Sequence, residues 1–333
     1  GMCCQNETQR CYMKNPKWAS CLESCEAGVH DSDPKAARTA WACTDVDKGP
    51  PSVAAPGVVA SPAPPPGYVA RPVEMLPAPS YPDRPPVGPG RAGLELFCFS
   101  LIQAQGYEPR MLAMEHGLGT SIFACEEFSI YSSAVFQIVE GVYTEQVNSD
   151  LKCEFHEIAW NTNIFIAVWA KVIADGTFRA RDWTVKVDAD ATFLPDRLRA
   201  ALQDHPNAGY ISNCHFGLHG PIEVFSRRAV EALAADYGRS VGGSRPETCV
   251  QRMPEAITGR AQWGEDMFVD KCLTEVLGVT GELDSRIMCE AHCDCPNWYW
   301  CANGTSRVTY HPFKREDMYR QCLANQLSGV SAA

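Results

Sequence analysis

A proline-rich stretch divides the chain into parts that cannot share one core. Fourteen of the 24 prolines lie between Pro50 and Pro89. Proline fixes φ and removes the backbone donor, so neither a helix nor a sheet can continue through such a stretch. We therefore expect residues 44–93 to be an extended, semi-rigid linker. A small module, residues 1–43, precedes it, and a larger domain, residues 94–333, follows.

Cysteine dominates the N-terminal module. Six of the chain's 17 cysteines fall within residues 1–43, and so short a segment needs cross-links to stay folded. The pattern from Cys11 to Cys25, with Trp18 inside it, resembles small cysteine-and-tryptophan modules of secreted carbohydrate-active proteins. That resemblance implies a carbohydrate-binding module. The alternative is a disulfide knot with a structural role alone.

The distribution of cysteines also indicates a cellular compartment. They are spread along the whole sequence, and two glycosylation sequons begin at Asn6 and Asn303. Both features favour the secretory pathway, either the Golgi lumen or the extracellular space, with several disulfide bonds in a glycoprotein. No apolar run approaches the roughly 18 residues of a membrane span, so we expect any signal or membrane anchor to lie outside this sequence.

Net charge excludes one class of partner. The formal charge of −11 argues against binding a nucleic-acid backbone, which requires clustered Lys and Arg. It does not oppose binding a nucleotide, because local fields from metals and helix ends decide that.

The large domain alternates between strand-like and helix-like stretches. We expect strands at residues 96–102, 128–132, 183–188, 210–213 and 222–225, and helices at residues 161–174, 195–202, 226–237 and 264–277. Ser226 is the expected N-cap of the third helix. Such alternation predicts an α/β fold, a Rossmann-like mixed sheet flanked by helices.

The strand at residues 183–188 leads directly into Asp188-Ala189-Asp190. In α/β sheets, ligands bind beyond the carboxyl ends of strands. Two carboxylates one residue apart can reach one hard divalent cation, which keeps positions open for diphosphate oxygens. Such a triplet also occurs by chance on solvated loops. Here an apolar strand precedes it and a helix starting at Pro195 follows, and both favour a metal site.

Three further segments follow in a fixed order, at residues 220–230, 263–272 and 308–314. Together with Asp188 and Asp190 they resemble the GT-A-fold glycosyltransferases of the Fringe and β-1,3-galactosyltransferase type. Those proteins share a metal motif rich in Lys, Val and Asp, a Gly-Pro strand before a serine-started helix, a Glu-Asp helix start and a late histidine. The resemblance implies metal-dependent, inverting transfer of a sugar from a nucleotide-sugar, a UDP-sugar, to a glycan or glycoprotein acceptor.

The same resemblance implies roles for individual residues. Asp188, Asp190 and His311 would hold Mn²⁺ or Mg²⁺, with Asp188 also on the donor side. Asp266 would be the general base that takes the proton of the acceptor hydroxyl, and Glu265 is the second candidate. The alternative for both acids is that they only satisfy the dipole at a helix N-terminus.

Other side chains are candidates for the two substrate sites. Lys186 lines the donor site or faces solvent, and Lys314 is a candidate diphosphate contact. Trp263 is either a platform for the acceptor sugar or packing for its loop. Residues 100–108, which follow the first strand, offer no residue that we would assign to the nucleotide pocket.

A dense segment at residues 289–301 allows two interpretations. Its four cysteines and His292 could hold zinc. However, the spacing does not form two Cys-X₂-Cys units, and an oxidising compartment favours disulfides, which we expect here. Trp298 and Trp300 are candidates for a wall of the acceptor site, with core packing as the alternative.

The sequence departs from the family pattern at one position. Ala189 stands where many of the close relatives have an aspartate, so no particular sugar can be assigned. The chain could instead be a secreted carbohydrate-binding protein with a catalytically inactive glycosyltransferase-like domain. A nucleotidyltransferase would need a basic triphosphate loop after the first strand, and residues 103–107 do not supply one.

Overall fold

The computed structural model describes residues 94–327, apart from 153, 156–158, 259–262, 294, 296–300 and 302–305. Before them it describes residues 10–15, 18–22, 24–29, 40 and 43–45. Most of the expected linker therefore lies outside the described residues, as do Trp298, Trp300 and the side chain of His292.

The described part of the N-terminal module is a small antiparallel sheet. Its strands, in the order β2-β1-β3, are β1 (Arg10–Asn15), β2 (Trp18–Leu22) and β3 (Thr44–Asp45). Strand β3 pairs with β1 and so extends the module two residues into the stretch expected to be linker. A disulfide joins Cys25 to Cys43. Carbohydrate binding by this module stays a prediction.

A seven-stranded mixed sheet forms the centre of the large domain, in the order β15-β13-β14-β11-β4-β5-β8. Strands β11, β4, β5 and β8 are parallel, and β14 runs antiparallel to both β11 and β13. Their bounds are β4 Leu96–Leu101, β5 Glu127–Ser132, β8 Glu145–Gln146, β11 Trp183–Val187, β13 Tyr210–Ser212, β14 Ile222–Ser226 and β15 Gly281–Leu283.

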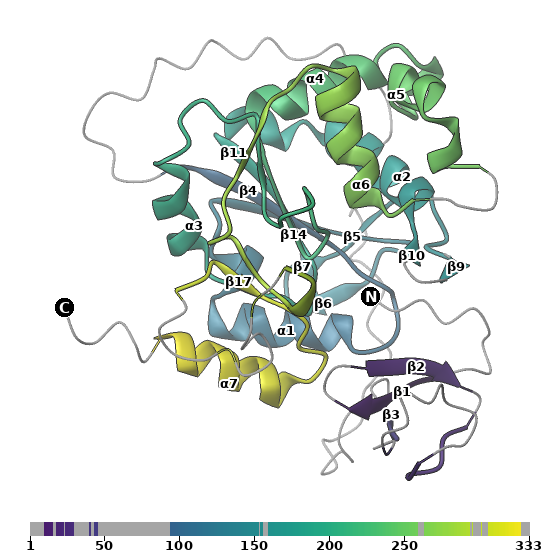
Figure 1. The fold of residues 1–333 in the computed structure, drawn as a ribbon, viewed down its shortest axis with the longest axis vertical. Helices are drawn as coiled ribbons and strands as arrows, with labels where there is room; N and C mark the ends of the chain where they lie inside the picture. Colours follow the sequence, from purple (N-terminus) through teal and green to yellow (C-terminus); the bar gives the residue numbers. More distant parts are fainter. Residues whose placement is uncertain are drawn as a thin grey trace.

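Helices cover both faces of this sheet, which confirms the expected fold class. Figure 1 shows α2, α4, α5 and α6 on one side and α1 with α7 on the other. The helices are α1 Glu108–Leu118, α2 Thr162–Asp175, α3 Pro195–Leu202, α4 Arg227–Tyr237, α5 Glu247–Arg252, α6 Glu265–Lys271 and α7 Glu316–Leu327. Alternation along β4 explains the two cores. Phe97 and Phe99 pack in the core with α2 and α4, while Leu96 and Cys98 pack in the core with α1 and α3.

Small sheets position the later segments. The most important has the order β12-β17-β16, formed by β12 (Thr192–Phe193), β17 (Thr309–Tyr310) and β16 (Met288–Cys289). Two-stranded ladders pair β6 (Gln137–Val139) with β7 (Val142–Tyr143) and β9 (Glu154–Phe155) with β10 (Ala159–Trp160). Because β12 follows the Asp188 turn, its pairing with β17 brings the late part of the chain to the end of β11.

The expected elements occur within one residue of their predicted bounds, with two differences of detail. Ser226 precedes α4 as expected, but its hydroxyl donates to the Gly209 carbonyl and accepts no hydrogen bond from the first turn of the helix. The helix expected at residues 264–277 is α6 followed by a π turn, Cys272–Val276.

Disulfide bonds tie these elements together. The bonds are Cys98–Cys125, Cys214–Cys293, Cys249–Cys272, Cys289–Cys295 and Cys301–Cys322, besides Cys25–Cys43. All four cysteines of the segment 289–301 are in these bonds, so disulfides are confirmed there and the zinc interpretation is wrong. The six disulfides among the described residues indicate an oxidising, secretory or extracellular environment. Among the described residues, no helix has both the length and the apolar character needed to cross a membrane.

Candidate metal and acceptor site

The turn after β11 presents two carboxylates and turns the residue between them inward. Asp188 is partly exposed, Asp190 is buried, and Ala189 packs in the core on the α1 and α3 face of the sheet. Backbone hydrogen bonds fix this geometry, since the Asp188 amide donates to the Pro221 carbonyl at 3.0 Å and the Phe313 amide donates to the Asp190 carbonyl at 2.8 Å.

His311 joins these carboxylates because β17 pairs with β12. Donor atoms of Asp188, Asp190 and His311 all lie within 4.8 Å of one another, and His311 Nε2 is 3.2 Å from Asp190 Oδ1. The structure thus brings together the three residues that the sequence predicted as metal ligands. Two carboxylates and an imidazole suit a divalent cation such as Mn²⁺ or Mg²⁺.

The field at this point favours positive charge, as a cation site requires. Burial alone would lower the pKa of His311, but the charges of Asp190 and Glu290 raise it to about 10. Burial would likewise raise the pKa of Asp190, yet the charge of His311, followed by that of Lys314, holds it well below its usual range. A proton therefore occupies His311 when no metal competes for it.

Tyr107 and Lys314 complete the surroundings of Asp190. The Tyr107 hydroxyl donates to Asp190 Oδ2 at 2.9 Å, and Lys314 Nζ lies 3.9 Å from the same oxygen. The Lys314 ammonium also lies 5.6 Å from the centre of the Tyr107 ring. Tyr107 belongs to the segment in which the sequence pointed to no residue. Lys314 is where a diphosphate contact was predicted, and that role stays a prediction.

Lys186 lies beneath the site rather than in it. The side chain is buried, with its ammonium 2.8 Å from Asp188 Oδ1, 2.9 Å from Glu265 Oε1 and 3.7 Å from Glu223 Oε1. These carboxylates raise its pKa well above the ordinary value, although burial by itself lowers it. The solvent-facing alternative for Lys186 is therefore wrong. A contact from Lys186 to the donor stays a prediction.

Glu265 and Asp266 start α6, but they differ in accessibility. Glu265 is buried, with one oxygen on Lys186 and the other accepting from Asn161 Nδ2 at 2.6 Å. Asp266 is more open, and its Oδ2 accepts from the Gly220 amide at 3.1 Å. A Cβ at Gly220 would lie 3.2 Å from Glu265 Oε1 and 3.7 Å from Asp266 Oδ2. Glycine at position 220 thus allows the β13–β14 connection to pass close to the start of α6.

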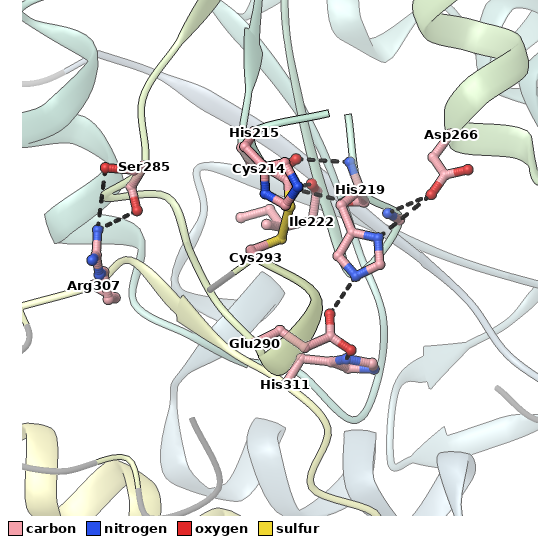
Figure 2. Close-up of a disulfide and its surroundings, with 12 residues drawn as sticks. Cys214, His215, His219, Ile222, Asp266, Ser285, Glu290, Cys293, Arg307 and His311 are labelled. Carbon is pink, nitrogen blue, oxygen red and sulfur yellow. Dashed lines mark hydrogen bonds and ion pairs between the residues drawn. A yellow bond between two sulfur atoms is a disulfide. The ribbon is translucent and has the colours of Figure 1, made fainter. Parts of the chain in front are cut away.

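A chain of alternating acids and histidines links Asp266 to the metal ligands (Figure 2). His219 Nδ1 lies 3.7 Å from Asp266 Oδ2, and its Nε2 makes a short contact with Glu290 Oε2. The other oxygen of Glu290 lies 3.2 Å from His311 Nδ1. Burial by itself raises the pKa of Asp266, but the nearby His219 imidazole lowers it below its ordinary value. Asp266 is therefore ionised near neutral pH.

The remaining aromatic candidates are only partly accounted for. Trp263 is half-buried against the core that contains α2 and α6, and its carbonyl accepts from Thr162 Oγ1 at 2.8 Å. The Lys271 ammonium lies 5.8 Å from the centre of the Trp263 ring. A role for this ring, or for Trp298 and Trp300, in acceptor binding stays a prediction.

Sequence reasoning missed three polar residues at this site: Tyr107, His219 and Glu290. Each meets its partner only through long-range packing, since Tyr107 is 83 residues from Asp190 and His219 is 71 from Glu290. A weak signal existed for His219, because it directly precedes the Gly220-Pro221 motif. Tyr107 and Glu290 carry no comparable signal.

Comparison with known proteins adds little to this geometry. No protein-family model and no curated protein sequence matches the chain. Among solved structures it is similar to a glycosyltransferase involved in the glycosylation of the major capsid of PBCV-1. The identity is 11%, the TM-score is 0.38, and the match covers 69% of this chain and 99% of that one. So low a TM-score supports no conclusion about family or activity.

Proposed function

We propose that the chain is a metal-dependent glycosyltransferase that moves a sugar from a UDP-sugar to a hydroxyl of a glycan or glycoprotein, with inversion. One observation carries the proposal. Asp188, Asp190 and His311 converge at the carboxyl end of a central strand, where α/β folds bind ligands. An ionised carboxylate, Asp266, is held nearby through Gly220 and His219. The GT-A resemblance of the motifs gives the arrangement its reaction class.

Each side chain has a distinct role in this proposal. Asp188, Asp190 and His311 hold Mn²⁺ or Mg²⁺, which offsets the charge of the leaving diphosphate when bound. Lys314, close to Asp190, adds positive charge on the donor side. Lys186 orients Asp188 from below. These residues hold the donor, and the residues at the start of α6 remove the proton from the acceptor hydroxyl.

Asp266 is the better candidate for the general base. A base must reach the acceptor hydroxyl directly or through one water. Both oxygens of Glu265 are occupied by Lys186 and Asn161 in a buried pocket. Asp266 is less buried, and its pKa lies below the ordinary value, so it is available as a carboxylate. We assign Glu265 to holding Lys186.

UDP release tests the proposal directly. With Mn²⁺ and a panel of UDP-hexoses and UDP-N-acetylhexosamines, the wild type should release UDP, and faster when methyl glycosides are added as acceptors. Asp190→Asn should lower release at least about 100-fold, because it removes a metal ligand. Asp266→Asn should lower acceptor-dependent release by about 10²–10⁴-fold while leaving Mn²⁺ binding intact.

The control for these variants is Asp196→Asn, which changes a fully exposed acid on α3 and should release UDP at the wild-type rate. Wild-type release no faster than that of Asp190→Asn, for every donor, would refute the proposal. Metal-independent glycan binding without turnover would instead support the secreted binding protein.

The same proposal places the protein in the secretory pathway. The disulfides of the large domain require oxidising conditions to form. We further propose that the module at residues 1–43 binds carbohydrate and that the proline-rich linker tethers it to the catalytic domain.

A further inference from the structure

Glu290 is a buried carboxylate that the proposed reaction does not use. It follows β16 and is 6% exposed. Each of its oxygens meets a different histidine, with Oε1 3.2 Å from His311 Nδ1 and Oε2 in a short contact with His219 Nε2. Figure 2 shows the carboxylate between the two rings. No other residue in the contacts described above touches both.

These contacts fix the orientation of both imidazole rings. An imidazole carries its nitrogens on opposite sides, so a partner on one nitrogen decides where the other points. With Glu290 on Nδ1 of His311, the Nε2 of that ring faces Asp190 at 3.2 Å. With Glu290 on Nε2 of His219, the Nδ1 of that ring faces Asp266 at 3.7 Å. One carboxylate thus orients a ring toward the metal ligands and a ring toward the base.

The backbone holds Glu290 and His219 close to each other. The disulfide Cys214–Cys293 joins the loop that carries His219 to the short 3₁₀ helix Ala291–Cys293. The Cys293 amide donates to the Glu290 carbonyl at 3.1 Å. Asn213 fixes His219 further, because its side chain accepts from the His219 amide at 2.7 Å and donates to the His219 carbonyl at 2.8 Å.

We propose that Glu290 is a positioning residue that orients His311 for metal binding and His219 for its contact with Asp266. The His219 half rests on the proposed glycosyl transfer, whereas the His311 half requires only that the metal binds. In the contacts described above, Glu290 reaches Asp190 and Asp266 only through His311 and His219. It acts through the two imidazoles.

Two substitutions separate orientation from charge. Glu290→Leu removes both hydrogen-bond acceptors and should weaken Mn²⁺ binding, measured by isothermal titration calorimetry, by about 10–100-fold. Glu290→Gln keeps the shape, with an amide oxygen to accept from His311 Nδ1 and an amide N–H to donate to His219 Nε2. It should bind Mn²⁺ within about threefold of the wild type. Equal losses in the two variants would overturn positioning in favour of charge alone.

A double-mutant cycle tests the His219 half. At saturating Mn²⁺ and with a methyl glycoside acceptor, His219→Gln and Glu290→Leu should each lower the kcat of UDP release about tenfold. The double variant should be no slower than either, because Glu290 acts on transfer through His219. His219→Gln should leave Mn²⁺ affinity unchanged. Multiplicative losses in the double variant would overturn this half.

Controls separate this proposal from misfolding and from a failure of the proposed function. Glu282→Leu removes the carboxylate that lies 2.7 Å from His205 Nδ1, away from the site, and should leave Mn²⁺ affinity unchanged. If Glu290→Leu fails to fold, Glu290→Asp serves instead, because its shorter side chain cannot reach both rings and should weaken Mn²⁺ binding. If the wild type releases no UDP from any donor, the proposed function fails, and unchanged Mn²⁺ affinity in Glu290→Leu still overturns the role of Glu290.

Discussion

At the scale of single residues, the site is stabilised by buried side chains of opposite charge that lie in contact with one another. Lys186 neutralises Asp188 and Glu265 beneath the metal ligands. Its third neighbour, Glu223, responds differently, since burial raises its pKa well above the ordinary value despite the charge of Lys186. Breaking a buried pair by removing one partner costs about 3–5 kcal/mol, so this lysine has a structural value apart from any contact with the donor.

His219 predicts a pH dependence of stability. Burial alone lowers its pKa, but the carboxylates of Asp266 and Glu290 raise that pKa from 6.5 to about 9. Because the folded-state pKa is the higher one, the stabilisation is complete below about pH 6 and disappears as the pH rises through about 9. In metal-free protein, the free energy of unfolding of the wild type should therefore fall between these pH limits by up to about 3 kcal/mol more than that of His219→Gln.

Urea denaturation in the presence of EDTA, repeated across this pH range, measures the difference in unfolding free energy. His205→Gln is the control, because His205 contacts Glu282 and Asp284 at the edge of the sheet and should leave the pH dependence arising from His219 in place. A constant difference between the wild type and His219→Gln at all pH values would contradict the prediction.

At the scale of elements, the sequence predicts what depends on local pattern. The alternation at residues 183–187 predicts β11, and Pro195 predicts the start of α3 because proline suits a first helical turn. The order of the motifs predicted that Asp188, Asp190 and His311 form one site. The hydroxyl of Ser226 donates a hydrogen bond to the Gly209 carbonyl, which lies next to it in the folded chain. Such a tertiary contact cannot be predicted from the local sequence. The contacts of Glu290 were unpredictable for the same reason.

The disulfide Cys214–Cys293 should stabilise the connection between two elements of the site. It closes a loop with a sequence separation of 79 residues, for which the loss of unfolded-chain entropy is worth about 4 kcal/mol. We expect Cys214→Ser/Cys293→Ser to lose a large part of this stabilisation, measured as the free energy of unfolding in denaturant. The variant should also weaken Mn²⁺ binding, because Glu290 hydrogen-bonds to the Cys293 amide.

The comparison for this variant is Cys249→Ser/Cys272→Ser, whose disulfide joins α5 to the turn after α6 and has a sequence separation of 23. It should lose stability but keep its Mn²⁺ affinity once folded. Equal effects of the two variants on Mn²⁺ binding would contradict a specific role for Cys214–Cys293.

At the scale of the whole molecule, the described cores belong to the large domain. Each of the three core clusters draws its buried residues from the range 96–323. We therefore expect the domain to fold without the module that precedes the linker. The five disulfides described in this domain also join cysteines within this range.

We expect residues 94–333, expressed alone in an oxidising compartment, to fold with a melting temperature within about 3 °C of the full chain. UDP release with small acceptors should be unchanged, because every residue assigned to the site lies in this part. A larger KM for polymeric glycans than the full chain shows would support carbohydrate binding by the module. Loss of Mn²⁺ binding on truncation would show that the two parts depend on each other.

The inward orientation of Ala189 limits how this site can change over evolution or by design. Its methyl group is packed among apolar side chains and is 4% exposed, so a carboxylate there would be charged inside a core rather than added to the ring of ligands. The single mutation Ala189→Asp would therefore not add a third metal ligand unless neighbouring residues are repacked. A designer seeking a tighter cation site in this scaffold would have to work from the opposite wall, around Lys314 and Tyr107.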